Sequence, residues 1–186
     1  MKEDKLKESL SKTDVDVSQV LQIMDSVVLE YSKDLDAVMQ HITDEILMDN
    51  NPAIVTIEKY FLELSGCLYT MCEKVERLGV FDSISKSRAQ DTYNTKYLEH
   101  QGSNMGKPGA KKPTVAESTA TAEMESLYDK TVNDIYSKAY KILKNKISAA
   151  ETMISTLSKI LSHRIQESQM MVTQTGRQVL NEGDVF

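Results

Sequence analysis

No glycine or proline occurs between Thr114 and Gly176. Because these two residues are the strongest breakers of helices, an interval of this length without either indicates one unusually long helix. The sequence Thr114-Val-Ala-Glu117 at its start has the form of a capping box, in which both side chains satisfy backbone amides. We predict a very long C-terminal helix over 114–168, which would extend roughly 80 Å at about 1.5 Å per residue.

Apolar residues also recur at alternating steps of three and four, the spacing of a helix that buries one stripe. The first run is Val17, Leu21, Met24, Val28, Tyr31, Leu35, Val38 and Ile42. The second run is Ile54, Ile57, Phe61, Leu64, Leu68, Met71, Val75 and Leu78. The third run, with Ala150 inside it, is Tyr136, Tyr140, Leu143, Ile147, Ile154, Leu157 and Leu161. A strict seven-residue repeat of this kind is typical of coiled helices.

Turn residues divide the chain. The sequence Asp49-Asn50-Asn51-Pro52 predicts that a first helix ends near Met48. Residues 80–100 are interpreted as a continuation of the second helix past Gly79 or as a short extra helix. The predicted organisation is a flexible tail over 1–13, an arm of two to three helices over 14–100, a flexible Gly/Pro/Lys loop over 101–113, the long helix over 114–168, and a flexible acidic tail over 169–186. The predicted fold is all-α, an extended antiparallel helical hairpin or three-helix coiled coil.

Composition supports this fold and narrows the function. Aromatic residues are 6% of the chain, and glycine and proline together are ten residues, which is unlike a strand-rich protein. The charged start of the chain predicts neither a signal peptide nor a membrane span. Cys67 and Cys72 lie about 140° apart on a helix and are not expected to pair, so we expect a cytoplasmic protein, in an infected host cell if the chain is phage-encoded.

Nothing in the sequence indicates catalysis, a metal or a cofactor. His41, His100 and His163 lie in different segments, and none has a second ligand at metal spacing. The stretch from Gly102 to Lys107 has the wrong glycine spacing for a phosphate-binding loop, and proline follows its lysine. We therefore predict a non-enzymatic interaction protein.

Two features of the third helix leave alternatives open. Its apolar seam either packs inside one chain or joins copies of the chain as a homo-oligomer. Residues 138–164 carry six basic residues and one acid, whereas residues 1–50 carry five lysines and twelve acids. The basic stretch either pairs with the acidic first helix or follows the phosphates of a nucleic acid, with tyrosines as stacking surfaces. The candidate contact residues are Lys111, Lys112, Lys138, Lys141, Lys144 and Lys146.

The arrangement resembles the UvsY-type recombination mediators of tailed phages. The resemblance rests on Tyr31-Ser32-Lys33-Asp34-Leu35 in the first helix, a second helix leading into a loop, and a long helix that starts at Thr114-Val115 and ends basic at Ser162-His-Arg-Ile165. It covers most of residues 17–168. The strongly acidic first fifty residues, the longer loop and the negative net charge depart from that pattern.

The resemblance implies a phage-type DNA recombination accessory protein. Such mediators are small, oligomeric helical hairpins that bind single-stranded DNA and contact a recombinase and a single-strand-binding protein. The six candidate lysines would carry DNA binding here. The alternative is a coiled-coil module that binds no nucleic acid, such as a virion component, an assembly chaperone or an inhibitor.

Overall fold

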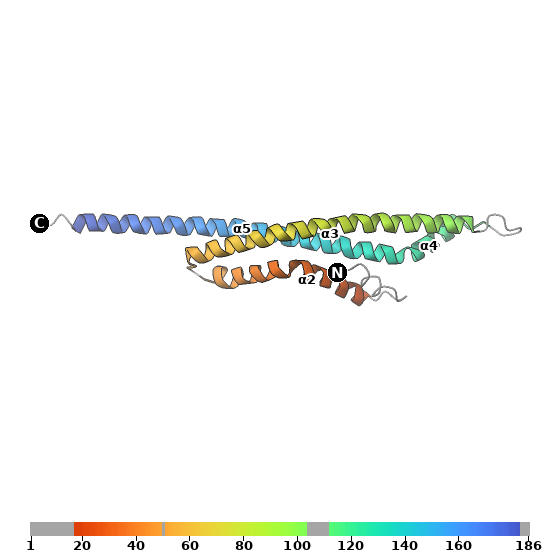
Figure 1. Cartoon of the computed structure of the whole chain (residues 1–186), viewed down its shortest axis with the longest axis horizontal. Helices are drawn as coiled ribbons and strands as arrows, with labels where there is room; N and C mark the ends of the chain where they lie inside the picture. The colour runs from red at the N-terminus through yellow and green to blue at the C-terminus, as the bar shows by residue number, and fades with distance from the viewer. Residues whose placement is uncertain (1–16, 50, 104–111, 183–186) are drawn as a thin grey trace. The chain divides into compact units, whose positions relative to one another are not determined.

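The computed structural model describes residues 17–49, 51–103 and 112–182, with side chains as far as Thr173. Its elements are all helical: α2 (Val17–Ile42), a π-helical turn η1 (Thr43–Leu47), α3 (Ile54–Gly102), α4 (Val115–Glu125) and α5 (Leu127–Glu182) (Figure 1). The predicted all-α fold, a helical hairpin with one very long C-terminal helix, is confirmed. The predicted tail over 1–13 and Lys111 in the predicted loop lie outside the described residues.

The chain forms two compact units, and α2, α3 and α5 each contribute to both. The first unit is Met1–Tyr31 with Glu73–Lys144, and the second is Ser32–Cys72 with Asn145–Phe186. The structure describes the first of these segments only from Val17 onward. Each unit has its own buried residues.

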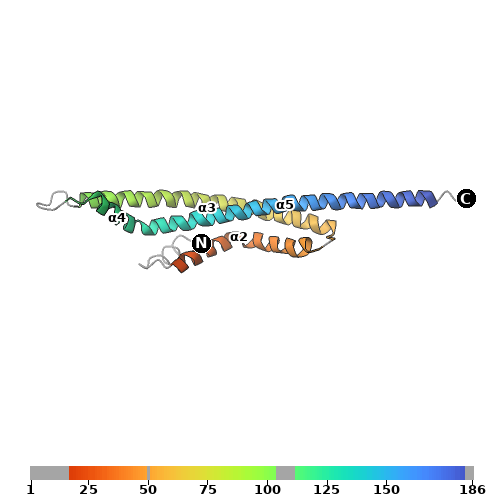
Figure 2. The ribbon, with the colours of Figure 1, turned by 180° about the vertical axis from the view of Figure 1, so that it is seen from behind.

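In the first unit, α3 runs antiparallel to α4 and α5. Hydrogen bonds join Asp82 to Asn133 (3.3 Å between Oδ1 and Nδ2) and Thr92 to Asp129 (2.7 Å). Further along α3, the His100 ring lies 3.0 Å from the Ser118 hydroxyl of α4. As residue numbers increase along α3, the numbers of the residues that it contacts in α5 and α4 decrease. Helix α3 is therefore antiparallel to both. Figures 1 and 2 show these segments side by side from both directions.

The N-terminal half of α2 covers Ile135 of α5 in the first unit. Ile135 is 1% exposed, and the partly buried residues that pack against it are Val20, Ile23, Met24, Tyr128 and Val132. The first predicted run is shifted here, because Val27 is buried while Val17 and Leu21 are exposed. The seven-residue repeat of that run therefore matches the buried residues only in its second half.

The second unit buries apolar residues from all three predicted runs. Its fully buried members belong to α2, α3 and α5 and include Ile42, Ile57, Leu64 and Leu157. Asp36 of α2 accepts hydrogen bonds from Lys146 of α5, while Ile46 of η1 lies by Ile160, so α2 runs parallel to α5. The π-helical turn keeps Ile46 buried at the end of α2, near the predicted end at Met48.

The sequence predicts one unbroken helix over 114–168, whereas the structure divides it near its start, at Ser126. Ser126 is buried, and its hydroxyl donates to the Glu123 carbonyl (3.4 Å). A serine that bonds its own backbone competes with the regular helix, and neither glycine nor proline is needed for the break. The capping box of Thr114 and Glu117 is present as predicted.

α5 continues to Glu182, well past the predicted end at Ser168 and through Gly176 into the segment predicted as a flexible tail. Likewise α3 passes through Gly79 without a break and ends two residues inside the predicted loop, at Gly102. A single glycine costs a helix only about 1 kcal/mol relative to alanine, so it ends a helix only where other forces agree.

Gly79 offers a test of the contact between α3 and α5. A Cβ atom at this position would lie 3.0 Å from Cε2 of Tyr140, whereas a Cβ at Gly66 would meet nothing within 4 Å. We expect Gly79→Val to lower the free energy of unfolding by about 1–3 kcal/mol, as overpacked sites do. Gly66→Ala is the control and should raise it by about 0.5–1 kcal/mol. Urea denaturation followed by circular dichroism measures both, and equal effects would contradict the close approach.

Candidate nucleic-acid interface

A solvent-open hollow of about 310 Å³ in the first unit combines lysines with a tyrosine. We call it the Tyr93 groove, and it is lined by Lys86, Ala89, Gln90, Tyr93, Glu123, Lys130 and Asn133. The Lys130 ammonium lies 5.0 Å from the centre of the Tyr93 ring, within the range of a cation–π contact. Tyr97, one turn further along α3, stacks on Tyr93 with ring centres 6.5 Å apart.

Polar contacts beside the groove hold its two walls in register. Asn133 of α5 donates to the carbonyl of Asp82 (3.2 Å) and to the Ser85 hydroxyl (3.1 Å) of α3. Asp129 accepts a hydrogen bond from Thr92 at 2.7 Å. Thr92 is one residue before Tyr93 on α3, and Asp129 and Asn133 lie on either side of Lys130 on α5. These bonds therefore hold the helix segments that carry Tyr93 and Lys130.

The positive face of α5 continues beyond the groove. Lys141 follows Lys130 by eleven residues, so it lies about 20° away on the same face and roughly 16 Å further along the axis. Lys138 lies about 80° from Lys130 on the same side. Both Lys138 and Lys141 are exposed. Lys130, Lys138 and Lys141 thus form one row that starts at Tyr93, with exposed Asp134 between Lys130 and Lys138.

The other two candidate lysines of α5 are engaged with acids. The Lys144 ammonium donates to Glu76 of α3, and this hydrogen bond raises the pKa of Lys144. The Lys146 ammonium donates to both carboxylate oxygens of Asp36 at 2.6 Å. For these two residues the structure supports the alternative of pairing, with one partner on the acidic first helix and one on α3.

The remaining candidates are not brought to the groove by any contact. Lys112 is exposed and precedes α4, and Lys111 lies outside the described residues. In the second unit, Lys159 and Arg164 line a separate hollow of about 500 Å³ together with Asp49 and Glu167. Arg164 donates to Glu167 at 2.7 Å, so acids offset its charge.

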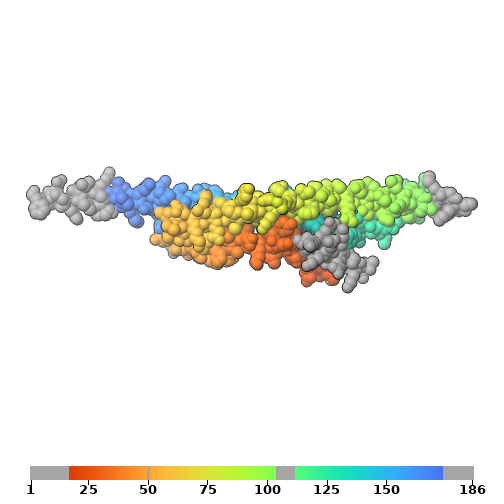
Figure 3. Space-filling view, in the orientation of Figure 1, coloured from red at the N-terminus to blue at the C-terminus, as the bar shows by residue number. Residues whose placement is uncertain are grey.

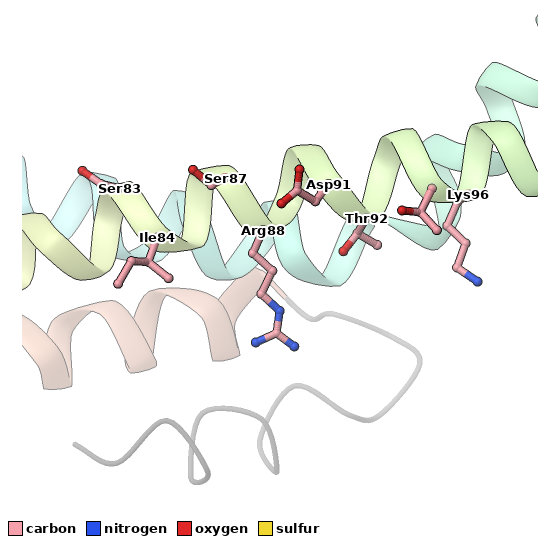
Figure 4. Close-up of a pocket in the computed structure, with 8 residues that line it drawn as sticks. Ser83, Ile84, Ser87, Arg88, Asp91, Thr92 and Lys96 are labelled. Carbon is pink, nitrogen blue, oxygen red and sulfur yellow. The ribbon is translucent and has the colours of Figure 1, made fainter.

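A third hollow, of about 650 Å³, lies along α3 in the first unit (Figure 4). Two cations, Arg88 and Lys96, line it, but each lies against acids. Arg88 is 3.4 Å from Asp129, and Lys96 is 3.0 Å from Glu99, whose hydrogen bond raises the pKa of Lys96. With Asp91 also at the rim, three acids lie beside the two cations of this hollow.

The predicted apolar seam of α5 is largely buried within a single chain. Leu143 and Leu157 are fully buried and Ile147 is 6% exposed. Tyr136 stacks on Phe81 with ring centres 6.1 Å apart, and Tyr140 lies against Gly79. Ile154 and Leu161 are half-buried. These positions support the alternative in which the seam is part of the core of one chain.

Sequence reasoning missed Lys86, Tyr93 and Lys130. The signal was present, since Lys86, Gln90, Tyr93 and Tyr97 follow one another at steps of four, three and four and so share one face of a helix. It was hidden because the apolar pattern weakens after residue 80. Without a known register between the helices, Lys130 could not be assigned to the same surface.

Comparisons with models of known protein families, with characterised proteins and with solved structures give no match for this chain. Within residues 17–49, 51–103 and 112–182, no cluster of three or more His, Cys, Asp or Glu side chains is placed to hold a metal ion. No helix in that same part of the chain combines the length and apolar character needed to cross a membrane.

Proposed function

We propose that this protein binds single-stranded DNA along the Tyr93 groove and the lysine row of α5, as an accessory protein in DNA recombination. The observation that carries the proposal is the Lys130 ammonium 5.0 Å over the Tyr93 ring, beside Lys86, in a hollow open to solvent. This combination of aromatic surface and positive charge is what sequence-independent single-strand binders use.

The charge distribution favours single strands over duplex DNA. The chain has a net charge of −6, which disfavours a dedicated duplex-DNA binder. A single strand needs only a narrow row of cations and a ring on which an unpaired base can stack. Lys130, Lys138 and Lys141 with Tyr93 meet that smaller requirement.

The role in recombination follows the resemblance to the UvsY-type mediators. An accessory protein of this kind is an oligomeric helical scaffold that holds single strands and contacts a recombinase and a single-strand-binding protein. The all-α hairpin fits such a scaffold because long helices provide separate surfaces for DNA and for protein. The DNA-binding step is the part that the Tyr93 groove supports directly.

Titration of a labelled single-stranded oligonucleotide tests the proposal. We expect binding at 50 mM salt that weakens roughly tenfold to fiftyfold by 200 mM, as three or four phosphate contacts predict. A duplex of the same length should bind more weakly. Fluorescence anisotropy measures both, and undetectable binding at 50 mM, or binding that ignores salt, would contradict the proposal.

A coiled-coil module that binds only protein is the second candidate. The observation that favours it is a set of large apolar side chains on the outer face of α3, namely Val55, Leu62 and Tyr69, which are 75%, 70% and 77% exposed. This candidate predicts self-association or partner binding without DNA affinity. The same titration therefore separates the two functions.

A further inference from the structure

In the second unit, α3 has an outer apolar stripe opposite its buried face. Val55, Leu62 and Tyr69 are seven residues apart, and each is at least 70% exposed. Each also lies two positions before a buried residue, Ile57, Leu64 and Met71, and therefore about 200° around the helix. Single exposed apolar residues are ordinary, but three in heptad register form a seam that fits another helix. We call this set the α3 stripe.

The C-terminal part of α5 packs on little of its own chain. Every side chain described over 168–173 is exposed. Figures 1 and 2 both show α5 continuing past the turn between α2 and α3, and Figure 3 shows its described atoms extending beyond the first turns of α3. The helical backbone continues to Glu182. We call residues 165–182 the α5 extension.

The α5 extension carries the same spacing as the α3 stripe. Ile165 is 38% exposed and Val172 is 71% exposed, and in the sequence Val179 follows at the same seven-residue step. Val55 and Leu62, like Ile165 and Val172, are one heptad apart, or about 10 Å along the helix. A parallel pairing sets Ile165 against Val55 and Val172 against Leu62.

We propose that the α3 stripe binds the α5 extension of a second copy of this chain. A chain cannot make this contact with its own α3, because its α5 extension leads away from the start of that helix (Figure 1). A two-fold axis near the start of α3 lets each copy place its extension along the stripe of the other. The contact is then isologous, which is the commonest form of a closed dimer.

The two-fold symmetry enlarges the area of the interface. One seam of a few apolar pairs is well short of the roughly 1,200 Å² at which stable specific interfaces begin. Two-fold symmetry makes the seam occur twice and brings the apolar residues of both extensions into one contact. This inference deepens the oligomeric part of the proposed function and rests on it, but it does not depend on DNA binding. Mass measured without DNA therefore tests it separately.

The first experiment measures the mass of the full chain by sedimentation equilibrium. We expect the wild type to show twice the chain mass of 21.0 kDa. Leu62→Glu and Val172→Lys should each raise the dissociation constant at least about tenfold, because each places an unpaired charge in an apolar contact. Leu98→Glu is the matched control, since Leu98 is also on α3 and is 67% exposed, and it should leave the mass unchanged. Helicity should be unchanged in all three.

The double variant Leu62→Glu/Val172→Lys identifies the occupant of the stripe. In the proposed dimer each glutamate meets a lysine of the other copy, so the doubled mass should return. If two α3 stripes paired with each other instead, Leu62→Glu would weaken the dimer and Val172→Lys would neither weaken nor restore it. That result, or a wild type that remains a monomer at about 100 μM, would overturn the proposal.

Discussion

Replacing Leu143 with alanine is expected to lower the free energy of unfolding by about 2–5 kcal/mol. Leu143 is fully buried in the first unit, where α5 packs beside α3. Truncating such a leucine removes buried apolar surface and leaves a cavity that the surrounding helices fill only in part. Since small domains are stable by only about 5–15 kcal/mol, the change is a large fraction of the total. Urea denaturation followed at a helical circular-dichroism band measures it.

Leu98→Ala is the matched control for this prediction. It makes the same chemical change on α3, but Leu98 is 67% exposed, so the loss should stay within about 0.5 kcal/mol. The comparison also decides between the two interpretations of the α5 seam. A core position lowers stability at every protein concentration, whereas an interface position dissociates an oligomer into folded subunits. If Leu143→Ala reduced the mass in solution but kept the unfolding midpoint of the subunit, the core interpretation would be wrong.

The helical fold could be predicted because long stretches of the chain repeat one pattern. Leu64 and Leu143 lie at the centres of their runs and are fully buried, as a helix stripe requires. Less could be predicted at the margins. Val27 is buried where the repeat favours Val28, because the order in which α2 meets its neighbours decides which side faces inward.

The ends and breaks of helices were predicted less well than their existence. Gly79 carries a local signal for an end, yet α3 passes through it. Ser126 carries a weak signal and divides α4 from α5. Local preferences of about 1 kcal/mol are smaller than the packing of a long helix on its neighbours, so packing decides the outcome.

The candidate site was only partly predictable from the sequence for a related reason. Four lysines of α5 were identified, namely Lys138, Lys141, Lys144 and Lys146, but whether each is paired depends on the register between helices that are far apart in sequence. Lys144 meets Glu76 and Lys146 meets Asp36, whereas Lys141, on the same helix, is exposed. Tyr93 and Lys130 come together across α3 and α5 by that same register. The sequence pattern shows which residues are charged but not which residues they pair with.

Substitutions in the Tyr93 groove are expected to separate stacking from charge in the binding of single-stranded DNA. Tyr93→Leu keeps an apolar side chain between α3 and α5 but removes the ring, and one stacked base is worth about 1–3 kcal/mol. We expect single-strand affinity to fall by roughly fivefold to a hundredfold at every salt concentration. The salt dependence should not change, because the substitution removes no charge. Anisotropy titrations at several salt concentrations measure both quantities.

Removing a lysine should have the complementary effect. Lys141→Ala is expected to reduce the slope of log K against log salt by about 0.7, the value for one phosphate contact on a single strand. Lys144→Ala is the matched control one turn away, and it should change the slope much less because Glu76 already neutralises that ammonium. The two variants differ in the pairing of the lysine but not in chemistry. Equal losses from both would mean that DNA follows another face of α5, and an unchanged slope for Lys141→Ala would remove the lysine row from the binding surface.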